Sequence, residues 1–233
     1  MKVELPCRTC GCINHGIFCE VDQKLQEMVN FDKSPYNFEA NHSIFIEGNP
    51  ARNVYCIHEG RVKLFKTANN NQHVIRILGP GDIIGLRPIF SNEPYAATAQ
   101  TVEKTTVCVI PKKTILAMME HSRDFTAKIA EILAVELRVS EDQLISLLYD
   151  PVKKRTARLL LNLLEKEQGP NSNSTHKISL LKRIEMAQII GTTPESLSRT
   201  LHSFAQRGII EVNRKEILVL NREKLENISG INR

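Results

Sequence analysis

Short apolar runs recur between residues 38 and 111, and each is rich in β-branched or aromatic residues. The runs are 42–48, 53–60, 61–67, 73–79 and 105–111, with the sequences HSIFIEG, NVYCIHEG, RVKLFKT, HVIRILG and TTVCVIP. Glycine, asparagine and proline separate them, which is typical of strands joined by tight turns. Recurrence of short strands at close spacing favours a barrel or roll, so we predict a β-roll in this region.

Two segments of this region predict specific turns. The runs 53–60 and 61–67 meet at Glu59-Gly60, which predicts a β-hairpin. In the segment LGPGDIIG, glycines and Pro80 surround Ile83 and Ile84. That arrangement predicts a tight turn leading into a short buried segment.

The spacing of apolar residues becomes helical over residues 112–149. A seam with steps of 4, 3, 4 and 3 residues begins at Leu133, which is the a/d spacing of a coiled coil. With Ile129 one turn earlier, the seam comprises Ile129, Leu133, Leu137, Ser140, Leu144 and Leu147. A helix packed on its own domain gives a similar stripe, but the length of the seam and its flanking charges favour a homodimer contact. Asp150-Pro151 ends the helix and marks a domain boundary, because proline cannot continue the hydrogen-bond ladder.

After a further helix over 152–167, residues 184–210 predict two helices joined by a turn. Ala187 is small where two helices cross, and Gly191 suits the left-handed end of the first helix. Thr193 can cap the second helix, with Pro194 at its first position. Residues 209–221, IIEVNRKEILVLN, then predict a small hairpin. The order of these signals predicts a winged helix-turn-helix.

The second of these helices carries polar residues on one side, as a recognition helix in the major groove does. Arginine can bond guanine O6 and N7 together, and glutamate can accept from cytosine N4. The candidate DNA contacts are Thr193, Glu195, Ser198, Arg199 and His202 on the helix, and Arg214 and Lys215 at the hairpin tip. From residue 151 onward the chain has 15 Lys and Arg against 8 Asp and Glu, whereas the remainder has 16 against 18. This basic C-terminal part indicates a polyanionic partner.

Length and composition allow two cores in an α+β chain of 233 residues, of which 42% are hydrophobic. We expect a cysteine-rich arm over 1–24, a sensor β-roll over 25–120, a dimerisation helix over 121–150 and a DNA-binding domain over 151–233. No apolar stretch approaches the ~20 residues of a membrane span, and no secretory signal precedes the arm, so a cytoplasmic protein is expected. No catalytic constellation is present, so we do not expect an enzyme.

Four of the six cysteines lie within the first twenty residues, namely Cys7, Cys10, Cys12 and Cys19. The other two are Cys56 and Cys108. In a reducing compartment, clustered cysteines more often bind metal or perform redox chemistry than form disulfides. Cysteine sulfur is the preferred ligand of iron–sulfur clusters, and the spacing also fits zinc. Cys56 lies in an apolar run and is interpreted as a small core residue.

Taken together, these motifs resemble the CRP/FNR family over nearly the whole chain. That family combines a cyclic-nucleotide-binding-like β-roll (a jelly roll), a long dimer helix and a winged helix-turn-helix. The cysteine arm, together with Glu195, Ser198 and Arg199 in the pattern E-x-x-S-R, resembles the FNR-like (FnrN-type) branch. The sister CRP subgroup has arginine immediately before this glutamate, where the present chain has Pro194.

The resemblance implies an oxygen-labile [4Fe-4S] cluster held by Cys7, Cys10, Cys19 and Cys108. Cys12 is additional to the FnrN-like pattern, and it could substitute for Cys10 as a ligand. The resemblance further implies a homodimer on palindromic TTGAT-like promoter sites, a contact with RNA polymerase and activity when oxygen is low. Neither the direction of regulation nor the target genes follow from it.

Three alternatives have the same fold: a cyclic-nucleotide sensor, a sensor of haem or another small molecule, and a zinc-stabilised DNA-binding protein. Cyclic AMP binding in similar proteins uses a Gly-Glu pair and an Arg-Ser pair, but the matching stretches here are Gly85-Leu86 and residues 95–97, Tyr-Ala-Ala. No cyclic nucleotide is therefore expected. A haem or other small-molecule sensor would leave the cysteine arm unexplained, and a zinc-stabilised DNA-binding protein would be colourless.

Overall fold

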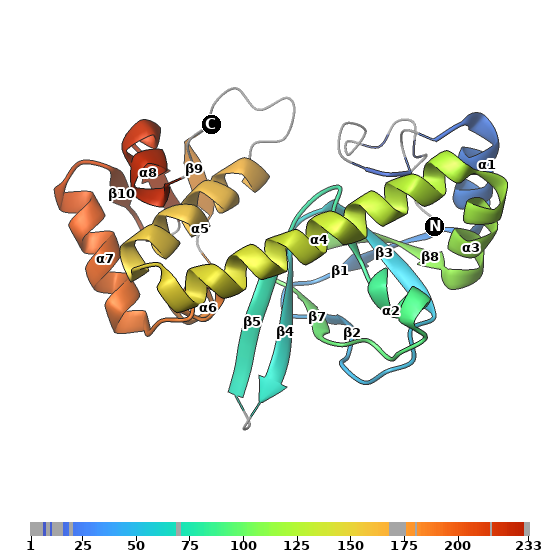
Figure 1. Cartoon of the computed structure of the whole chain (residues 1–233), viewed down its shortest axis with the longest axis horizontal. Helices are drawn as coiled ribbons and strands as arrows, with labels where there is room; N and C mark the ends of the chain where they lie inside the picture. Colours follow the sequence, from blue (N-terminus) through green and yellow to red (C-terminus); the bar gives the residue numbers. More distant parts are fainter. Residues whose placement is uncertain are drawn as a thin grey trace. The chain divides into compact units, whose positions relative to one another are not determined.

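The computed structural model describes residues 7, 10, 16–18, 21–68, 71–167, 176–179, 181–214 and 216–230. The chain forms two compact units, Met1–Arg138 and Val139–Arg233. The first is rich in strands, and the second consists mainly of helices with a small sheet (Figure 1). The α+β class and the β-roll followed by a helix-turn-helix are therefore confirmed. No helix in the described part of the chain is both long and apolar enough to cross a membrane.

In the described part of the first unit, eight strands form two antiparallel four-stranded sheets, with orders β1-β8-β3-β6 and β2-β7-β4-β5. Their bounds are β1 Ser34–Phe38, β2 Ser43–Phe45, β3 Asn53–Glu59, β4 Val62–Ala68, β5 Asn71–Leu78, β6 Ile83–Ile84, β7 Thr98–Thr101 and β8 Thr105–Pro111. Every run predicted from the sequence forms a strand, whereas β1 and β7 were not predicted. Both strands are short and carry mainly polar residues, so neither gives a clear apolar alternation.

The interior of the roll is apolar and aromatic. Ile57 and Val107 are fully buried there, and three rings, Phe45, Tyr55 and Tyr95, pack together among them. The rings of Phe45 and Tyr95 stack with centroids 4.0 Å apart, and the Tyr95 hydroxyl donates to the carbonyl of Asn53 over 2.7 Å. The polar end of Tyr95 is thus satisfied, while its ring fills the roll.

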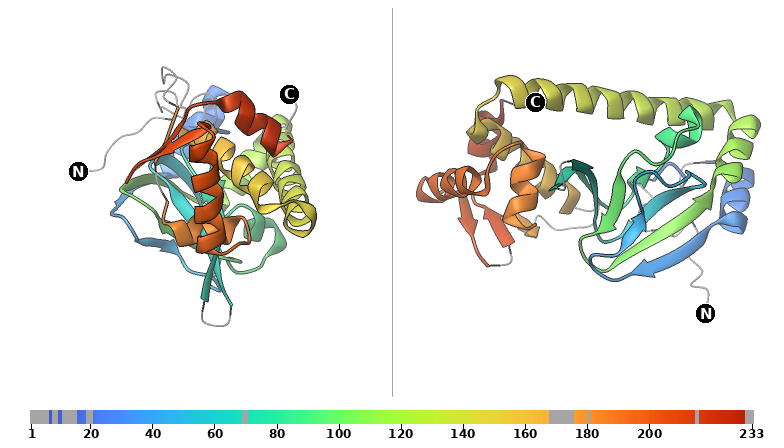
Figure 2. Two further views of the ribbon diagram at one scale, coloured as in Figure 1. Left: turned by 90° about the vertical axis from the view of Figure 1, so that its left-hand side faces the viewer. Right: turned by 90° about the horizontal axis from the view of Figure 1, so that it is seen from below.

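A second apolar core covers the opposite face of the β1-β8-β3-β6 sheet. It is built by helices α1 (Gln23–Asp32), α3 (Lys112–His121) and the first turns of α4 (Arg123–Tyr149). Figure 2 shows α1 and α3 beside this sheet. This core also contains the side chain of Ile110 from strand β8 and the side chain of Phe18 from the N-terminal arm. The rings of Phe18 and Phe125 are 6.1 Å apart. Phe18 of the arm is therefore packed directly on the start of α4.

The hairpin predicted at Glu59-Gly60 is wrong, because β3 and β4 belong to different sheets. The chain crosses between the sheets at Gly60, whose φ of +84° is left-handed. A Cβ at Gly60 would lie 2.5 Å from the carbonyl oxygen of Lys104 and 2.8 Å from Cα of Thr105. Local turn chemistry alone could not distinguish this crossing from a hairpin.

The predicted turn at residues 79–85 is confirmed, with Ile84 buried in the roll. The N–H of Gly79 donates to the carboxylate of Asp82 over 2.8 Å, and the N–H of Asp82 donates to the Gly79 carbonyl over 3.1 Å. A short helix that was not predicted, α2 (Arg87–Ser91), follows.

We expect Gly60→Ala to destabilise the β-roll more than Gly48→Ala does. Both glycines have left-handed φ, so each substitution incurs the conformational cost of about 1–2 kcal/mol. Only at Gly60 would the new methyl group also overlap backbone atoms, since nothing lies within 4 Å of a Cβ at Gly48. The extra loss at Gly60 should be about 1–3 kcal/mol, measured by urea unfolding of the two variants. Equal losses would show that the crossing tolerates a side chain.

Helix α4 faces two environments along its length. Ile129 is only 2% exposed and packs in the core below the sheet, with Leu133 partly buried against the same core. The assignment of Ile129 to a dimer seam is therefore corrected: its partner is the chain's own core. Further along, Leu137 is 62% exposed and Leu144 is 58% exposed, and Ser140 is exposed as well.

The second compact unit includes the last turns of α4, from Val139 onward, whereas the predicted boundary at Pro151 follows the end of that helix. The helix does end at Tyr149, but its last turns pack on the second unit. Gln143 donates to the carbonyl of Ile189 over 3.3 Å, and a Cβ at Gly191 would lie 2.6 Å from Leu147 Cδ2. The proline marks the end of a helix, and the packing determines where the compact units divide.

The rest of the second unit is α5 (Val152–Glu167), β9 (Lys177–Ser179), α6 (Arg183–Ile189), α7 (Pro194–Gln206), β10 (Ile210–Val212), β11 (Glu216–Val219) and α8 (Arg222–Ser229). The three strands form one antiparallel sheet in the order β10-β11-β9. The helix over 152–167 and the hairpin of β10 and β11 were predicted, whereas β9 and α8 were not.

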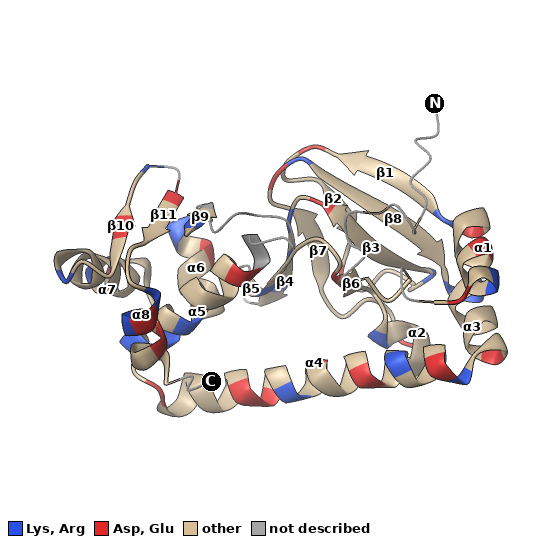
Figure 3. Cartoon of the chain, turned by 90° about the horizontal axis from the view of Figure 1, so that it is seen from above, with Lys and Arg blue, Asp and Glu red and all other residues tan. Residues whose placement is uncertain are grey.

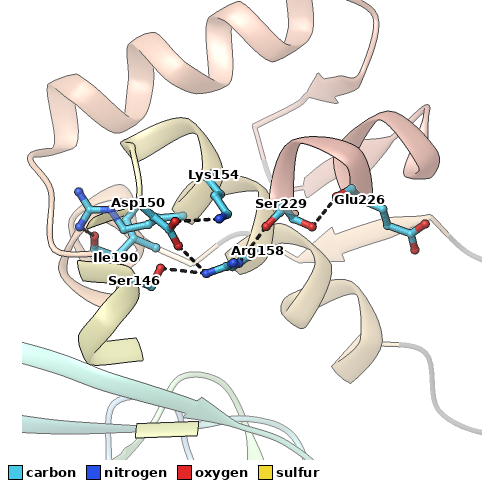
Figure 4. A network of polar contacts seen from close by, with 8 residues as sticks. Ser146, Asp150, Lys154, Arg158, Ile190, Glu226 and Ser229 are labelled. Carbon is cyan, nitrogen blue, oxygen red and sulfur yellow. Dashed lines mark hydrogen bonds and ion pairs between the residues drawn. The ribbon is translucent and has the colours of Figure 1, made fainter. Parts of the chain in front are cut away.

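A polar network joins the end of α4 to α5 and α8 (Figure 4). Arg158 donates to Asp150 over 2.6 Å, to the Ser146 hydroxyl over 3.2 Å and to the Ser229 carbonyl over 3.0 Å. Hydrogen bonding from Lys154, with further contributions from Ser146 and Arg158, holds the pKa of Asp150 below its ordinary value. The ionised Asp150 therefore contributes to the free energy of unfolding at neutral pH, and this contribution is lost as the pH falls through the lowered pKa.

Candidate nucleic-acid interface and cysteine site

The turn between α6 and α7 has the predicted construction. Gly191 has a left-handed φ of +59°, and the N–H of Thr192 donates to the Ala187 carbonyl over 2.9 Å. Ala187 is fully buried where the two helices meet. Arg155 of α5 fixes the same turn, donating to the carbonyls of Ile190 and Gly191 over 2.5 and 3.2 Å. The turn is therefore held from both sides, which sets the direction of α7.

Helix α7 is capped and amphipathic as expected. The Thr193 hydroxyl accepts from the N–H of Ser196 over 3.2 Å, and Pro194 occupies the first turn. Leu197, Leu201 and Phe204 are buried on its inner side. This apolar side anchors the helix on the second unit and leaves the other side in solvent.

The predicted contact residues of α7, namely Glu195, Ser198, Arg199 and His202, are all exposed. Glu195 lies in the first turn, where its own backbone N–H and then the Thr193 hydroxyl lower the pKa of its carboxyl. Glu195 is therefore an ionised acceptor at neutral pH, as recognition of a cytosine amino group requires. Beside them, a groove of about 500 Å³ separates α7 from the hairpin strands, lined by Arg183, Ser198, His202 and Glu211 among others.

The hairpin of β10 and β11 is closed at its tip by the N–H of Asn213, which donates to the Glu216 carbonyl over 2.9 Å. Figure 3 shows a basic position at this tip. Arg214 is exposed there, and Lys215 lies outside the described residues. The hairpin thus carries a cationic group suited to a phosphate contact.

The cysteine site lies on the β1-β8-β3-β6 sheet. Cys108 of β8 is directly opposite Cys56 of β3 in the antiparallel register, so the two side chains share one face of the sheet. Cys108 is buried, and Cys56 is only partly so. The interpretation of Cys56 as an ordinary core residue overlooked this pairing, because the register of two strands about fifty residues apart is not encoded in either strand alone.

The arm brings two further thiols to this face. Cys7 is 7% exposed; its backbone N–H donates to the side-chain oxygen of Asn30 over 3.2 Å, and Lys33 Nζ lies 2.9 Å from its Sγ. Cys10 Sγ lies 3.1 Å from Nδ1 of His58. Cys12 and Cys19, the other arm cysteines of the predicted ligand set, lie outside the described residues.

The electrostatics of the site are those of crowded thiols beside one cation. Burial raises the pKa of Cys108 to about 11, with Lys33 lowering it and the charges of Cys7 and Cys10 raising it. Burial, and then repulsion from Cys108, raise the pKa of Cys56 strongly. The positive charge of a bound metal centre would offset this repulsion and stabilise the thiolate form of each coordinated cysteine.

These donors fit a thiolate-ligated cluster in their chemistry. Cys7, Cys10 and Cys108 are soft ligands, gathered from the arm and the sheet with a cation nearby. Within the part of the chain that the structure describes, no three His, Cys, Asp or Glu groups converge as a metal cage. The described cysteines are thus near one another, but they do not form a closed cage.

Comparison with known proteins places both halves of the chain. Residues 35–122 match the cyclic nucleotide-binding domain, and residues 154–228 match the Crp-like helix-turn-helix domain. The CRP-like cAMP-activated global transcriptional regulator of Mycobacterium tuberculosis is 27% identical over 214 residues, covering 90% of this chain and 94% of that protein. The transcriptional activator protein anr of Pseudomonas aeruginosa is 23% identical over 229 residues, covering 96% and 92%.

Among solved structures, FixK2 from Bradyrhizobium japonicum has the same fold, with a TM-score of 0.77 at 22% identity, covering 86% of this chain and 99% of that chain. The two domain matches occur in the order of the two compact units, and the relatives extend over most of the chain. The chain therefore belongs to the CRP/FNR family of DNA-binding transcription regulators, which are not enzymes.

Proposed function

We propose that this regulator responds to oxygen through a [4Fe-4S] cluster held by Cys7, Cys10, Cys19 and Cys108, with Cys12 as a possible substitute for Cys10. The observation that carries the proposal is the gathering of Cys7 and Cys10 of the arm near Cys108 of the sheet. When bound, the cluster supplies an oxygen-labile centre. The chain's own residues would hold it between the arm, which provides Cys7, Cys10 and Cys19, and the sheet, which provides Cys108.

The route from the cysteine site to the dimer helix runs through the arm itself. Phe18 is 2% exposed and packs on Phe125 of α4, in the same core that holds Cys7 and Ile129. Docking of the arm therefore completes the core under the first turns of α4. We propose that cluster loss loosens this docking and so weakens the pairing of two α4 helices through Leu137, Ser140 and Leu144.

The test of the cluster is anaerobic purification followed by iron and sulfide analysis and a visible spectrum. A brown protein with about four iron and four sulfide per chain that bleaches in air supports the proposal. A colourless protein that contains zinc would support a structural metal in its place and would rule out the cluster.

On DNA, the proposed site is an inverted repeat of TTGAT-like half-sites, and the effect on transcription would run through RNA polymerase. Two recognition helices of a dimer must lie about 34–36 Å apart to read successive major grooves. Glu195 and Arg199 would read the G·C pair of each half-site, with Ser198 at the neighbouring thymine. Thr193 at the cap of the recognition helix and His202 further along it would also contact the DNA. Arg214 and Lys215 would contact the phosphates.

We expect Arg199→Ala to lose about 1–3 kcal/mol of binding free energy per half-site and to relax the preference for guanine, because a bidentate base contact is removed. Arg214→Ala is the matched control: a phosphate contact carries no base information, so all sequences should weaken equally and the salt dependence should fall. The measurement is titration against the palindrome and a guanine-substituted version. If Arg199→Ala weakens both DNAs by one factor, Arg199 does not read the base.

The alternative is a small molecule bound inside the roll, as the name of the mycobacterial relative indicates for cAMP in that protein. The aromatic filling of this roll by Phe45, Tyr55 and Tyr95 argues against it, since Tyr95 is only 4% exposed. Arg87, the nearest cation to the residue-85 turn in sequence, is exposed at the start of α2. Calorimetric titration with cAMP tests this alternative, and heat of specific binding would favour it.

A further inference from the structure

We propose that Lys33 and His58 form an outer shell of the cysteine site, each positioning one arm thiolate and together slowing oxidative loss of the cluster. This inference rests on the proposed function and deepens it. Neither residue was singled out by the sequence, because a lone lysine after a helix and a lone histidine in a strand carry no motif.

Lys33 is placed at the thiols by the end of α1. The helix ends at Asp32, and the N–H of Lys33 donates to the Val29 carbonyl over 2.9 Å, which fixes the backbone there. From this position Nζ reaches Sγ of Cys7 over 2.9 Å. Asn30, at the same helix end, accepts from the Cys7 backbone N–H. The end of α1 thus holds both the backbone and the sulfur of Cys7.

His58 plays the matching part for Cys10. It lies in β3 next to the register shift between Ile57 and Glu59, two residues from Cys56. Its Nδ1 is 3.1 Å from Sγ of Cys10, and with the proton on that nitrogen the imidazole donates to a thiolate. Both described arm cysteines therefore meet a nitrogen donor from the folded body of the first unit.

Hydrogen bonds to ligand sulfurs and nearby charge are the means by which a protein tunes an iron–sulfur centre. A fixed ammonium beside Cys7 disfavours removal of electrons from a centre bonded to that sulfur. Because Cys7 is almost fully buried, solvent screens this charge less than it would at the surface. Loss of the charge should therefore make the cluster more readily oxidised.

The experiment compares Lys33→Met and Lys33→Arg with wild type and with Lys24→Met, which removes the same charge from an exposed position of α1. After anaerobic reconstitution of the full-length protein, iron and sulfide content, the visible spectrum and the rate of bleaching in air-saturated buffer are measured. We expect Lys33→Met to bleach about 10-fold faster, with Lys33→Arg and Lys24→Met close to wild type. For His58→Ala we expect faster bleaching than for His73→Ala, an exposed histidine of β5.

Thermal unfolding of the cluster-free variants checks that each is folded, and Lys33→Gln, which also removes the charge, serves if Lys33→Met is not folded. Equal bleaching rates for wild type and Lys33→Met would overturn the proposal, and so would equal acceleration by Lys33→Met and Lys24→Met. These outcomes concern only the outer shell. A wild-type protein that takes up no iron would instead overturn the proposed function itself.

Discussion

Cys108→Ser is expected to abolish stable cluster binding and the anaerobic DNA-binding activity that depends on it. In the proposed ligand set Cys108 is the thiolate supplied by the sheet, and a cluster held by the arm alone would have no fixed anchor. The measurement is iron and sulfide per chain after anaerobic reconstitution, with DNA binding to the palindrome as the second readout.

Cys56→Ser is the matched control, because Cys56 lies directly opposite Cys108 on the next strand and undergoes the same chemical change. It should retain nearly all the iron. Serine variants of Cys10 and Cys12 then decide between those two arm ligands. Should Cys12→Ser lose iron while Cys10→Ser keeps it, the ligand assignment for the arm is wrong.

Leu137→Glu is expected to weaken dimerisation by about 3–5 kcal/mol, because two unpaired carboxylates would be buried against each other in the proposed seam. Leu137 is 62% exposed in the single chain, so the variant should still fold. Sedimentation equilibrium gives the dimer dissociation constant.

Val135→Glu provides the comparison within the same helix. Val135 is 44% exposed and precedes Leu137 by two residues, about 200° away around the helix. It should leave the dimer intact. An unchanged dimer with Leu137→Glu would exclude this side of α4 as the interface, whereas loss of the dimer with both variants would point to a broader contact surface.

The sequence was most informative where structure is determined locally. Gly191, Thr193 and Pro194 each act within one turn, and the helix-turn-helix was therefore predicted with its cap and its buried side. The short strands could be recognised in the same way. Which sheet each strand joins could not, and the crossing at Gly60 was consequently taken for a hairpin.

The candidate site was predictable only in part, for a related reason. The clustered cysteines of the arm can be recognised from their spacing in the sequence. Lys33 and His58, in contrast, become part of the site only through tertiary contacts. Helical periodicity likewise shows that Ile129 faces a partner without identifying it, and the partner is the chain's own core. The pattern of one sequence shows which face of a helix or strand is apolar, but long-range packing determines what that face contacts.

The order of strands in the β1-β8-β3-β6 sheet also has a consequence for biosynthesis. Strand β8, which carries Cys108, lies between β1 and β3, although it is the last strand of the roll to leave the ribosome. Cys108 follows Cys19 by 89 positions, so at ~5–20 residues per second the arm thiols emerge about 4–18 s before Cys108 does. Insertion of the proposed cluster would therefore have to wait until the roll has closed, and the thiols of the nascent arm would need protection from oxidants until then.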